Sequence, residues 1–143
     1  MNGNAKTAVK VLIISAMSVV RENLMRLMEA QPEIEIVKEA EDTPSGMQMI
    51  ESFIPDVAVL DLQMPLRKSM EAVRRMRALN PCIKIIALSM HPDCRYLVEF
   101  LQAGVCGYVL KDCAYEELAD AVRAVASDCQ YVSKSIRFPT SIL

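Results

Sequence analysis

The stretch VAVLDLQMP, residues 57–65, decides the fold class. Its first four residues are apolar without a polar break, and the run ends at an acid, Asp61. A continuous apolar run is typical of a strand covered on both faces, because a half-exposed strand alternates polar and apolar residues. Four further short runs are rich in Val and Ile, and several are nearly continuous: Val9–Ile14, Ile34–Val37, Ile83–Leu88 and Tyr108–Leu110.

The segments between these runs have helical periodicity, with apolar residues three and four positions apart. We expect Ser18 to cap the first helix and Thr43, followed by a proline, to cap the second. Asn80 with its following proline should end the third helix, and Gly104 the fourth. Five strand–helix units in succession predict an α/β, doubly wound, five-stranded parallel sheet with helices on both faces.

The composition describes one globular domain and excludes several functions. The chain has 143 residues, of which 52% are hydrophobic and 24% charged, with a formal net charge of −2. This charge gives no electrostatic reason for the domain alone to bind nucleic acid, and we expect no membrane contact because no apolar run reaches the length of a span. The five cysteines are odd in number and form no C-x-x-C pair, which argues against disulfides and structural zinc and favours the cytoplasm.

The ends of the chain differ from its centre. Residues 1–8 precede the first apolar run and are expected to be disordered or loose. Residues 9–129 contain all five strand–helix units and form the predicted domain. Residues 130–143 contain Ser, Lys and Pro without periodicity, so we interpret them as a linker or a loosely docked C-terminal tail.

The candidate site lies where the strands end. In a doubly wound sheet, ligands bind beyond the carboxyl ends of the strands. Ser15 and Ala16 follow the first strand, Asp61 the third, Ser89 the fourth and Lys111 the fifth. The sequence therefore predicts that a carboxylate, a hydroxyl and an ammonium group converge from distant parts of the chain.

Three motifs carry a family resemblance: VAVLDLQMP at 57–65, IIALSMH at 85–91 and AGVCGYVLKD at 103–112. With this order and spacing, the chain resembles the receiver domain of bacterial two-component response regulators, in particular the LuxR-type regulators, which often have AG-x-x-GY-x-LKD. The resemblance implies the flavodoxin-like (βα)5 receiver fold with strand order 2-1-3-4-5. It also implies a signalling module rather than an enzyme.

The resemblance assigns a role to each residue of the predicted site. Asp61 matches the aspartate that accepts a phosphoryl group from a histidine kinase. Ser89 matches the hydroxyl residue that hydrogen-bonds this group, and Lys111 the lysine that pairs with it. Tyr108 matches the aromatic residue that swings inward on activation. These roles are chemically reasonable, because a carboxylate is a competent nucleophile and cationic groups stabilise the charge that develops in phosphoryl transfer.

The chain departs from the family at the metal site. The family has two adjacent acids after the first strand, which hold Mg²⁺ together with the acceptor aspartate. Ser15 and Ala16 stand here instead. Because Mg²⁺ prefers carboxylate ligands in octahedral geometry, we expect no metal or other cofactor, and slow or absent phosphorylation. We expect Asp61 to be partnered by Lys111. Residues 66–69, LRKS, replace an acidic and glycine-rich stretch and make the rim of the site more positive.

The predicted function is that of an atypical receiver that acts through protein contacts, with a histidine kinase or another signalling protein as partner. We expect a homodimer through the face made by the fourth helix, the fifth strand and the fifth helix. That face is expected to include Arg95, Tyr96, Glu99, Tyr108, Tyr115, Glu116 and Arg123.

Other interpretations stay open. The chain could be a phosphorylatable receiver that uses Asp61 and forms the regulatory half of a LuxR-type DNA-binding transcription regulator, whose helix-turn-helix domain is not in this sequence. A flavodoxin-like cofactor binder is disfavoured, because there is no phosphate-binding loop. Tyr108 could serve core packing alone, and Ser15 could be a polar filler. For Arg74, Arg75 and Arg77, a solvated helix face is favoured over a functional basic patch.

Overall fold

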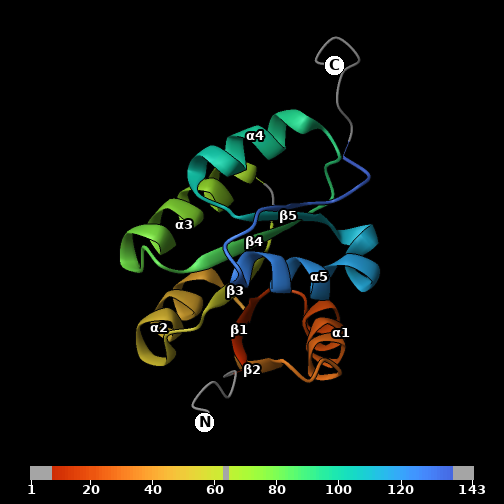
Figure 1. Ribbon diagram of the computed structural model, residues 1–143. Helices are drawn as coiled ribbons and strands as arrows, with labels where there is room; N and C mark the ends of the chain where they lie inside the picture. Colours follow the sequence, from red (N-terminus) through yellow and green to blue (C-terminus); the bar gives the residue numbers. More distant parts are fainter. Residues whose placement is uncertain (1–7, 63–64, 137–143) are drawn as a thin grey trace.

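The computed structural model describes residues 8–62 and 65–136, so the expectation for the first eight residues lies almost entirely outside the described part (Figure 1). The strands are β1 (Val9–Ile14), β2 (Ile34–Ala40), β3 (Val57–Asp61), β4 (Lys84–Ser89), β5 (Gly107–Leu110) and β6 (Tyr131–Val132). The helices are α1 (Ser18–Glu29), α2 (Thr43–Phe53), α3 (Leu66–Leu79), α4 (Cys94–Ala103) and α5 (Ala114–Ala126), with a 3₁₀ turn η1 (Lys111–Cys113) before α5.

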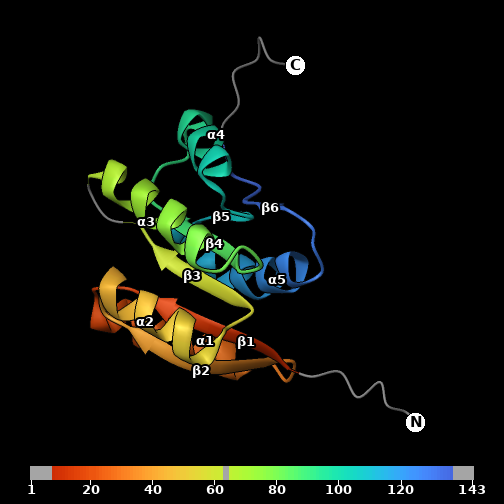
Figure 2. The ribbon, with the colours of Figure 1, turned by 90° about the vertical axis from the view of Figure 1, so that its left-hand side faces the viewer.

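The strands form one parallel sheet in the order β2-β1-β3-β4-β5-β6, which confirms the predicted order of the first five. Helices α2, α3 and α4 cover one face and α1 and α5 the other (Figures 1 and 2). Every residue of β3 is buried, because helices lie against both of its faces. This burial explains why the first four residues of β3 are continuously apolar.

The sixth strand was not predicted. The backbone N–H of Tyr131 donates to the carbonyl of Cys106, and that of Ser133 to the carbonyl of Tyr108 at 2.9 Å. The hydroxyl oxygen of Ser133 in turn accepts from the N–H of Leu110 at 2.9 Å. The segment interpreted as a linker or loosely docked tail is therefore packed on β5 as far as the buried Ile136, and residues 137–143 lie outside the described part.

The helix ends correct two predicted caps. Met17 precedes α1 without a side-chain cap, and Ser18 is the first helical residue. Asp42 rather than Thr43 caps α2: its carboxylate accepts from the N–H of Ser45 at 2.8 Å, and this hydrogen bond lowers the pKa of Asp42. Gly104 follows α4 at a φ of 122°, a conformation that favours glycine, as expected. Within the described residues, no helix combines the length and the apolar content needed to span a membrane.

Candidate functional site

Asp61 is the centre of the site at the carboxyl ends of the strands. It is the last residue of β3, and its side chain is fully buried. Its Oδ1 atom lies 2.5 Å from Nζ of Lys111, and its Oδ2 atom accepts from the hydroxyl of Ser15 at 2.7 Å. Both oxygens of the carboxylate thus contact groups of this chain, one an ammonium and the other a hydroxyl.

Ser15 is fixed in place by the segment that links β1 to α1. Its hydroxyl oxygen accepts from the N–H of Met17 at 3.3 Å, and its carbonyl accepts from Nη1 of Arg21 at 2.6 Å. The same guanidinium binds Oε1 of Glu39 through Nε at 2.7 Å. The structure therefore gives Ser15 a defined contact with Asp61, where the sequence suggested a polar filler. Ala16 is exposed, and its methyl group offers no metal ligand.

Ser89 and Tyr108 form a second buried pair beside Asp61. Their hydroxyl oxygens lie 2.8 Å apart, and neither residue is exposed. The Tyr108 oxygen is also 2.9 Å from the carbonyl of His91, and the His91 N–H donates to the Ser89 oxygen at 2.9 Å. Burial raises the pKa of Tyr108, so the phenol keeps its single proton.

Each of these two hydroxyl groups has one proton, which limits the hydrogen bonds that Ser89 and Tyr108 can donate to other groups. A carbonyl can only accept, so the bond to the His91 oxygen uses the Tyr108 proton. The Tyr108 hydroxyl also lies 2.8 Å from the Ser89 oxygen, so Tyr108 is the side-chain partner of Ser89. Ser89, which the sequence placed beside a phosphoryl group, is thus directed toward Tyr108 in this structure.

The predicted dimer face is not a single surface. Tyr108 is fully buried, and β5 is covered on its outer edge by β6. Tyr115 is 68% exposed but lines an apolar pocket between α1 and α5, together with Val20. Arg123 points to the opposite end of the sheet, where it binds Glu33. The structure therefore removes Tyr108 from the expected surface. The dimer through the face made by α4, β5 and α5 stays a prediction.

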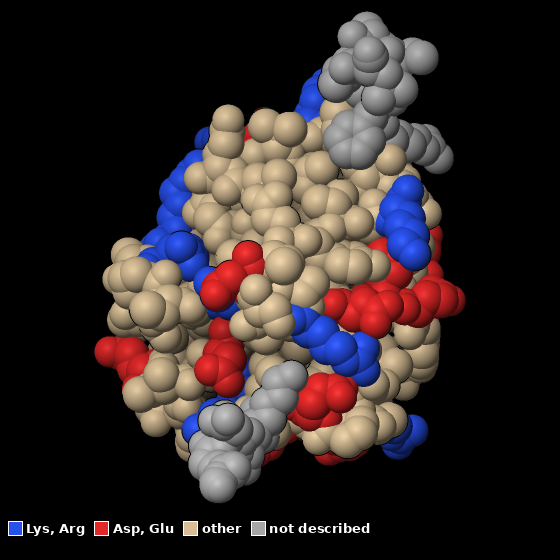
Figure 3. All heavy atoms as spheres, viewed as in Figure 1, with Lys and Arg blue, Asp and Glu red and all other residues tan. Residues whose placement is uncertain are grey.

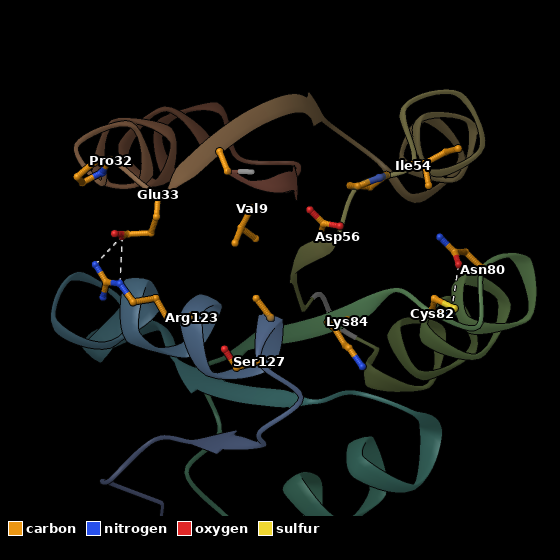
Figure 4. Close-up of a pocket in the computed structure, with 13 residues that line it drawn as sticks. Val9, Pro32, Glu33, Ile54, Asp56, Asn80, Cys82, Lys84, Arg123 and Ser127 are labelled. Atoms are coloured by element: carbon orange, nitrogen blue, oxygen red, sulfur yellow. Dashed lines mark hydrogen bonds and ion pairs between the residues drawn. The ribbon is translucent and has the colours of Figure 1, made fainter. Parts of the chain in front are cut away.

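A wide groove lies at the amino ends of the strands, the opposite end of the sheet from Asp61 (Figure 4). Its volume is about 880 Å³, and Val9, Ile54 and Asp56 are among the residues that line it. Ion pairs lie at its rim, including Arg123 with Glu33. No sequence pattern indicated this groove, because its residues come from distant parts of the chain.

The profile described as response regulator receiver domain matches residues 11–123. This chain belongs to the response regulator receiver domain family. As a receiver domain, it is a member of a family of signalling domains.

Curated relatives of this receiver domain are transcription regulators. The transcriptional regulatory protein DegU of Brevibacillus brevis is 31% identical over 90% of this chain and 54% of its own length. The DNA-binding transcriptional activator DevR/DosR of Mycobacterium tuberculosis is 34% identical over 83% of this chain and 55% of its own length. The receiver domain thus spans about half the length of these relatives.

Solved structures show the same fold. A two-component response regulator of the LuxR family from Aurantimonas sp. SI85-9A1 is 28% identical, with a TM-score of 0.84, and the match covers 91% of this chain and 93% of that one. The receiver domain of NarL from Mycobacterium tuberculosis is 26% identical, with a TM-score of 0.77, over 85% of this chain and 98% of that one. The receiver fold predicted from the sequence is confirmed.

Proposed function

We propose that this receiver domain signals through protein contacts and that its Mg²⁺-dependent phosphorylation is weak or absent. One observation carries the proposal: both oxygens of Asp61 contact side chains of the same chain, at 2.5 Å from Lys111 and 2.7 Å from Ser15. The ammonium group of Lys111 places a positive charge in contact with this carboxylate.

The residues at the carboxyl ends of the strands do not suit Mg²⁺. Within residues 8–62 and 65–136, no three His, Cys, Asp or Glu side chains are grouped as a metal site would need. Asp61 is the carboxylate at the acceptor position, and Ser15 and Ala16 occupy the two positions where the family has acids. The Ser15 hydroxyl already donates its proton to Asp61. A single carboxylate with both oxygens engaged is a poor ligand set for a hard, octahedral cation.

The position of Tyr108 supports a receiver whose conformation depends on internal hydrogen bonds. The family resemblance associates the inward position of this aromatic residue with activation. Tyr108 lies inward here, and its hydroxyl contacts Ser89 and the carbonyl of His91. These groups belong to the chain itself, so the inward position requires no phosphoryl group to hold it.

The partners follow from the family and stay predictions. A histidine kinase or another signalling protein is the proposed partner, and a cytoplasmic location fits the unpaired cysteines. Because the curated relatives are regulators about twice as long, we propose that this domain is the regulatory half of a DNA-binding transcription regulator. Homodimerisation through the face made by α4, β5 and α5 is also proposed, without the buried Tyr108 as a contact residue.

A second candidate function is a phosphorylatable receiver. It is favoured by one observation, the ion pair between Asp61 and Lys111, because that lysine could also pair with a phosphoryl group. In this case acetyl phosphate would modify Asp61 despite the missing acids.

Two measurements separate these functions. The first is thermal denaturation of the chain with and without millimolar Mg²⁺, and the second is mass spectrometry after incubation with acetyl phosphate. We expect no change in the midpoint and no added phosphoryl mass. The matched variant Ser15→Asp/Ala16→Asp restores the acid pair and should gain a Mg²⁺-dependent midpoint.

A clear rise of the wild-type midpoint with Mg²⁺ would contradict the proposal. A phosphoryl mass that is lost in Asp61→Ala would establish the second candidate instead.

A further inference from the structure

Helix α3 carries a row of exposed cations on one face. Arg67, Lys68, Arg74 and Arg75 are all exposed. At 100° per residue these four positions fall within one side of the helix. The opposite side packs into the core through Leu66, Ser69, Ala72, Val73 and Met76. Figure 3 shows Lys and Arg side chains gathered over α3 at the left of that view. We refer to Arg67, Lys68, Arg74 and Arg75 as the basic face of α3.

The cations of this face have no ionic partner within the described residues. The ion pairs found there involve Arg21, Lys84, Arg95, Lys111 and Arg123, and none involves the basic face. Glu71 is the one acid of α3 and lies among the four cations, also without an ion pair. A chain with a net charge of −2 therefore concentrates positive charge on this helix.

The stability of the helix does not explain these cations. Arg67 and Lys68 lie in the first turn of α3, which contains no acid and has no side-chain cap. The amino end of a helix carries a partial positive charge, so cations are disfavoured there and acids are favoured. Arg67 and Lys68 thus oppose the helix dipole, and no ion pair compensates for this within the described residues. We therefore infer that they serve to bind an anion from outside the chain.

We propose that the basic face of α3 binds an acidic segment of a partner protein. Three of its four cations are Arg, the charged residue that is enriched at protein interfaces, whereas Lys is depleted. The exposed Leu79 at the end of the helix adds apolar area beside the charges. A nucleic acid fits less well, because four phosphate contacts give weak, salt-sensitive binding and the net charge of the domain is negative.

This surface is distinct from the Asp61 site, although the two are close in sequence. Helix α3 begins at Leu66, shortly after Asp61 ends β3. An acidic segment bound to the first turn of α3 would therefore lie near the carboxyl ends of the strands. The inference rests on the proposed function in one respect: both assume that the partner of this domain is a protein.

The test is a titration of the ¹⁵N-labelled 143-residue chain with a helical peptide rich in glutamate, followed by amide shifts and by fluorescence anisotropy. We expect the shifts to concentrate on α3 and the affinity to fall with added salt. A peptide with glutamine in place of glutamate should not bind. The Mg²⁺ and acetyl phosphate measurements of the proposed function are made without the peptide, so failure of this inference and failure of the proposed function can be distinguished.

Charge-reversal variants provide the decisive comparison. We expect two double variants, Arg67→Glu/Lys68→Glu and Arg74→Glu/Arg75→Glu, each to lower the affinity for the peptide about tenfold. The first of these places acids in the first turn of α3, where they are favourable, so lost binding cannot be ascribed to unfolding. Arg26→Glu/Lys134→Glu is the matched control, because it changes the net charge equally at exposed positions elsewhere.

Two outcomes would overturn the inference. The first is equal binding of the peptide to wild type and to both α3 variants. The second is that a duplex DNA of equal charge changes the amide shifts of α3 and displaces the peptide. This result would show that the basic face of α3 binds nucleic acid.

Discussion

The two ends of the sheet contain ion pairs of the same chemistry in different surroundings. At the carboxyl ends, the Asp61 side chain is 0% exposed and that of Lys111 23%. At the amino ends, Glu33 and Arg123 are 38% and 41% exposed, and Lys84 and Asp128 are 29% and 78% exposed. Water and salt screen charges at the open groove but hardly reach Asp61. We therefore expect burial, rather than the distance between the charges, to decide which ion pair the stability of the fold depends on.

The largest expected effect is that of Lys111→Met. The variant leaves the Asp61 carboxylate buried with Ser15 as its remaining partner. Removing one member of a buried pair costs about 3–5 kcal/mol, and we expect the lower end because Lys111 is partly exposed. Urea denaturation measures this loss in the free energy of unfolding.

The control for this variant is the double variant Asp61→Asn/Lys111→Met, which removes both charges. It should recover most of the stability, because no uncompensated charge stays buried. A single variant as stable as wild type would show that water, rather than Lys111, balances the charge of Asp61.

The next effect is that of Ser15→Ala, at the same buried end. The variant removes the hydroxyl that donates to Oδ2 of Asp61 at 2.7 Å. An unsatisfied buried acceptor costs about 1–3 kcal/mol. Ser52→Ala, at an exposed position of α2, should leave the free energy of unfolding nearly unchanged. If the two variants lose equal stability, the Ser15–Asp61 hydrogen bond does not contribute.

The same contrast explains which parts could be predicted from the sequence. Buried strands leave continuous apolar runs, so the sheet and the convergence of Asp61 and Lys111 followed from the pattern. Strand β6 has only two residues, too few to show a period of two. The contacts of Ser15 with Arg21 and Asp61 depend on rotamers and on the path of one connection, which no pattern of residue types encodes.

Tyr131 of β6 is half-buried, between the buried Asp61 site and the open groove in its exposure to water. Burial and, secondarily, the hydrogen bond to Glu117 at 3.0 Å raise its pKa from 10.0 to about 12. Since the folded chain holds this proton more tightly than the unfolded chain, the stabilisation is fully present below pH 10.0 and is lost as the pH rises to about 12. The measurement is the free energy of unfolding against pH for wild type and Tyr131→Phe.

Because Tyr108 also has a raised pKa, both chains should lose stability in alkali, and only the difference between them reports Tyr131. Wild type should fall more steeply than Tyr131→Phe between pH 10.0 and about 12. Parallel curves would mean that the phenol of Tyr131 is as accessible to water in the folded chain as in the unfolded one.

The smallest expected effect is that of Lys84→Met, the same substitution as at Lys111 but at the open groove. The hydrogen bond from Lys84 to Asp128 raises the pKa of Lys84, and the two side chains are 2.6 Å apart. Exposed pairs nevertheless contribute only about 0–1 kcal/mol, because Asp128 recovers hydration when its partner is removed. Met keeps the aliphatic contacts of the lysine stem, so packing changes little in either variant.

The loss in the free energy of unfolding should be several-fold smaller for Lys84→Met than for Lys111→Met. It should shrink further in high salt, whereas the loss for Lys111→Met should not. Equal losses at the two positions would mean that the ion-pair distance, and not burial, determines the stability.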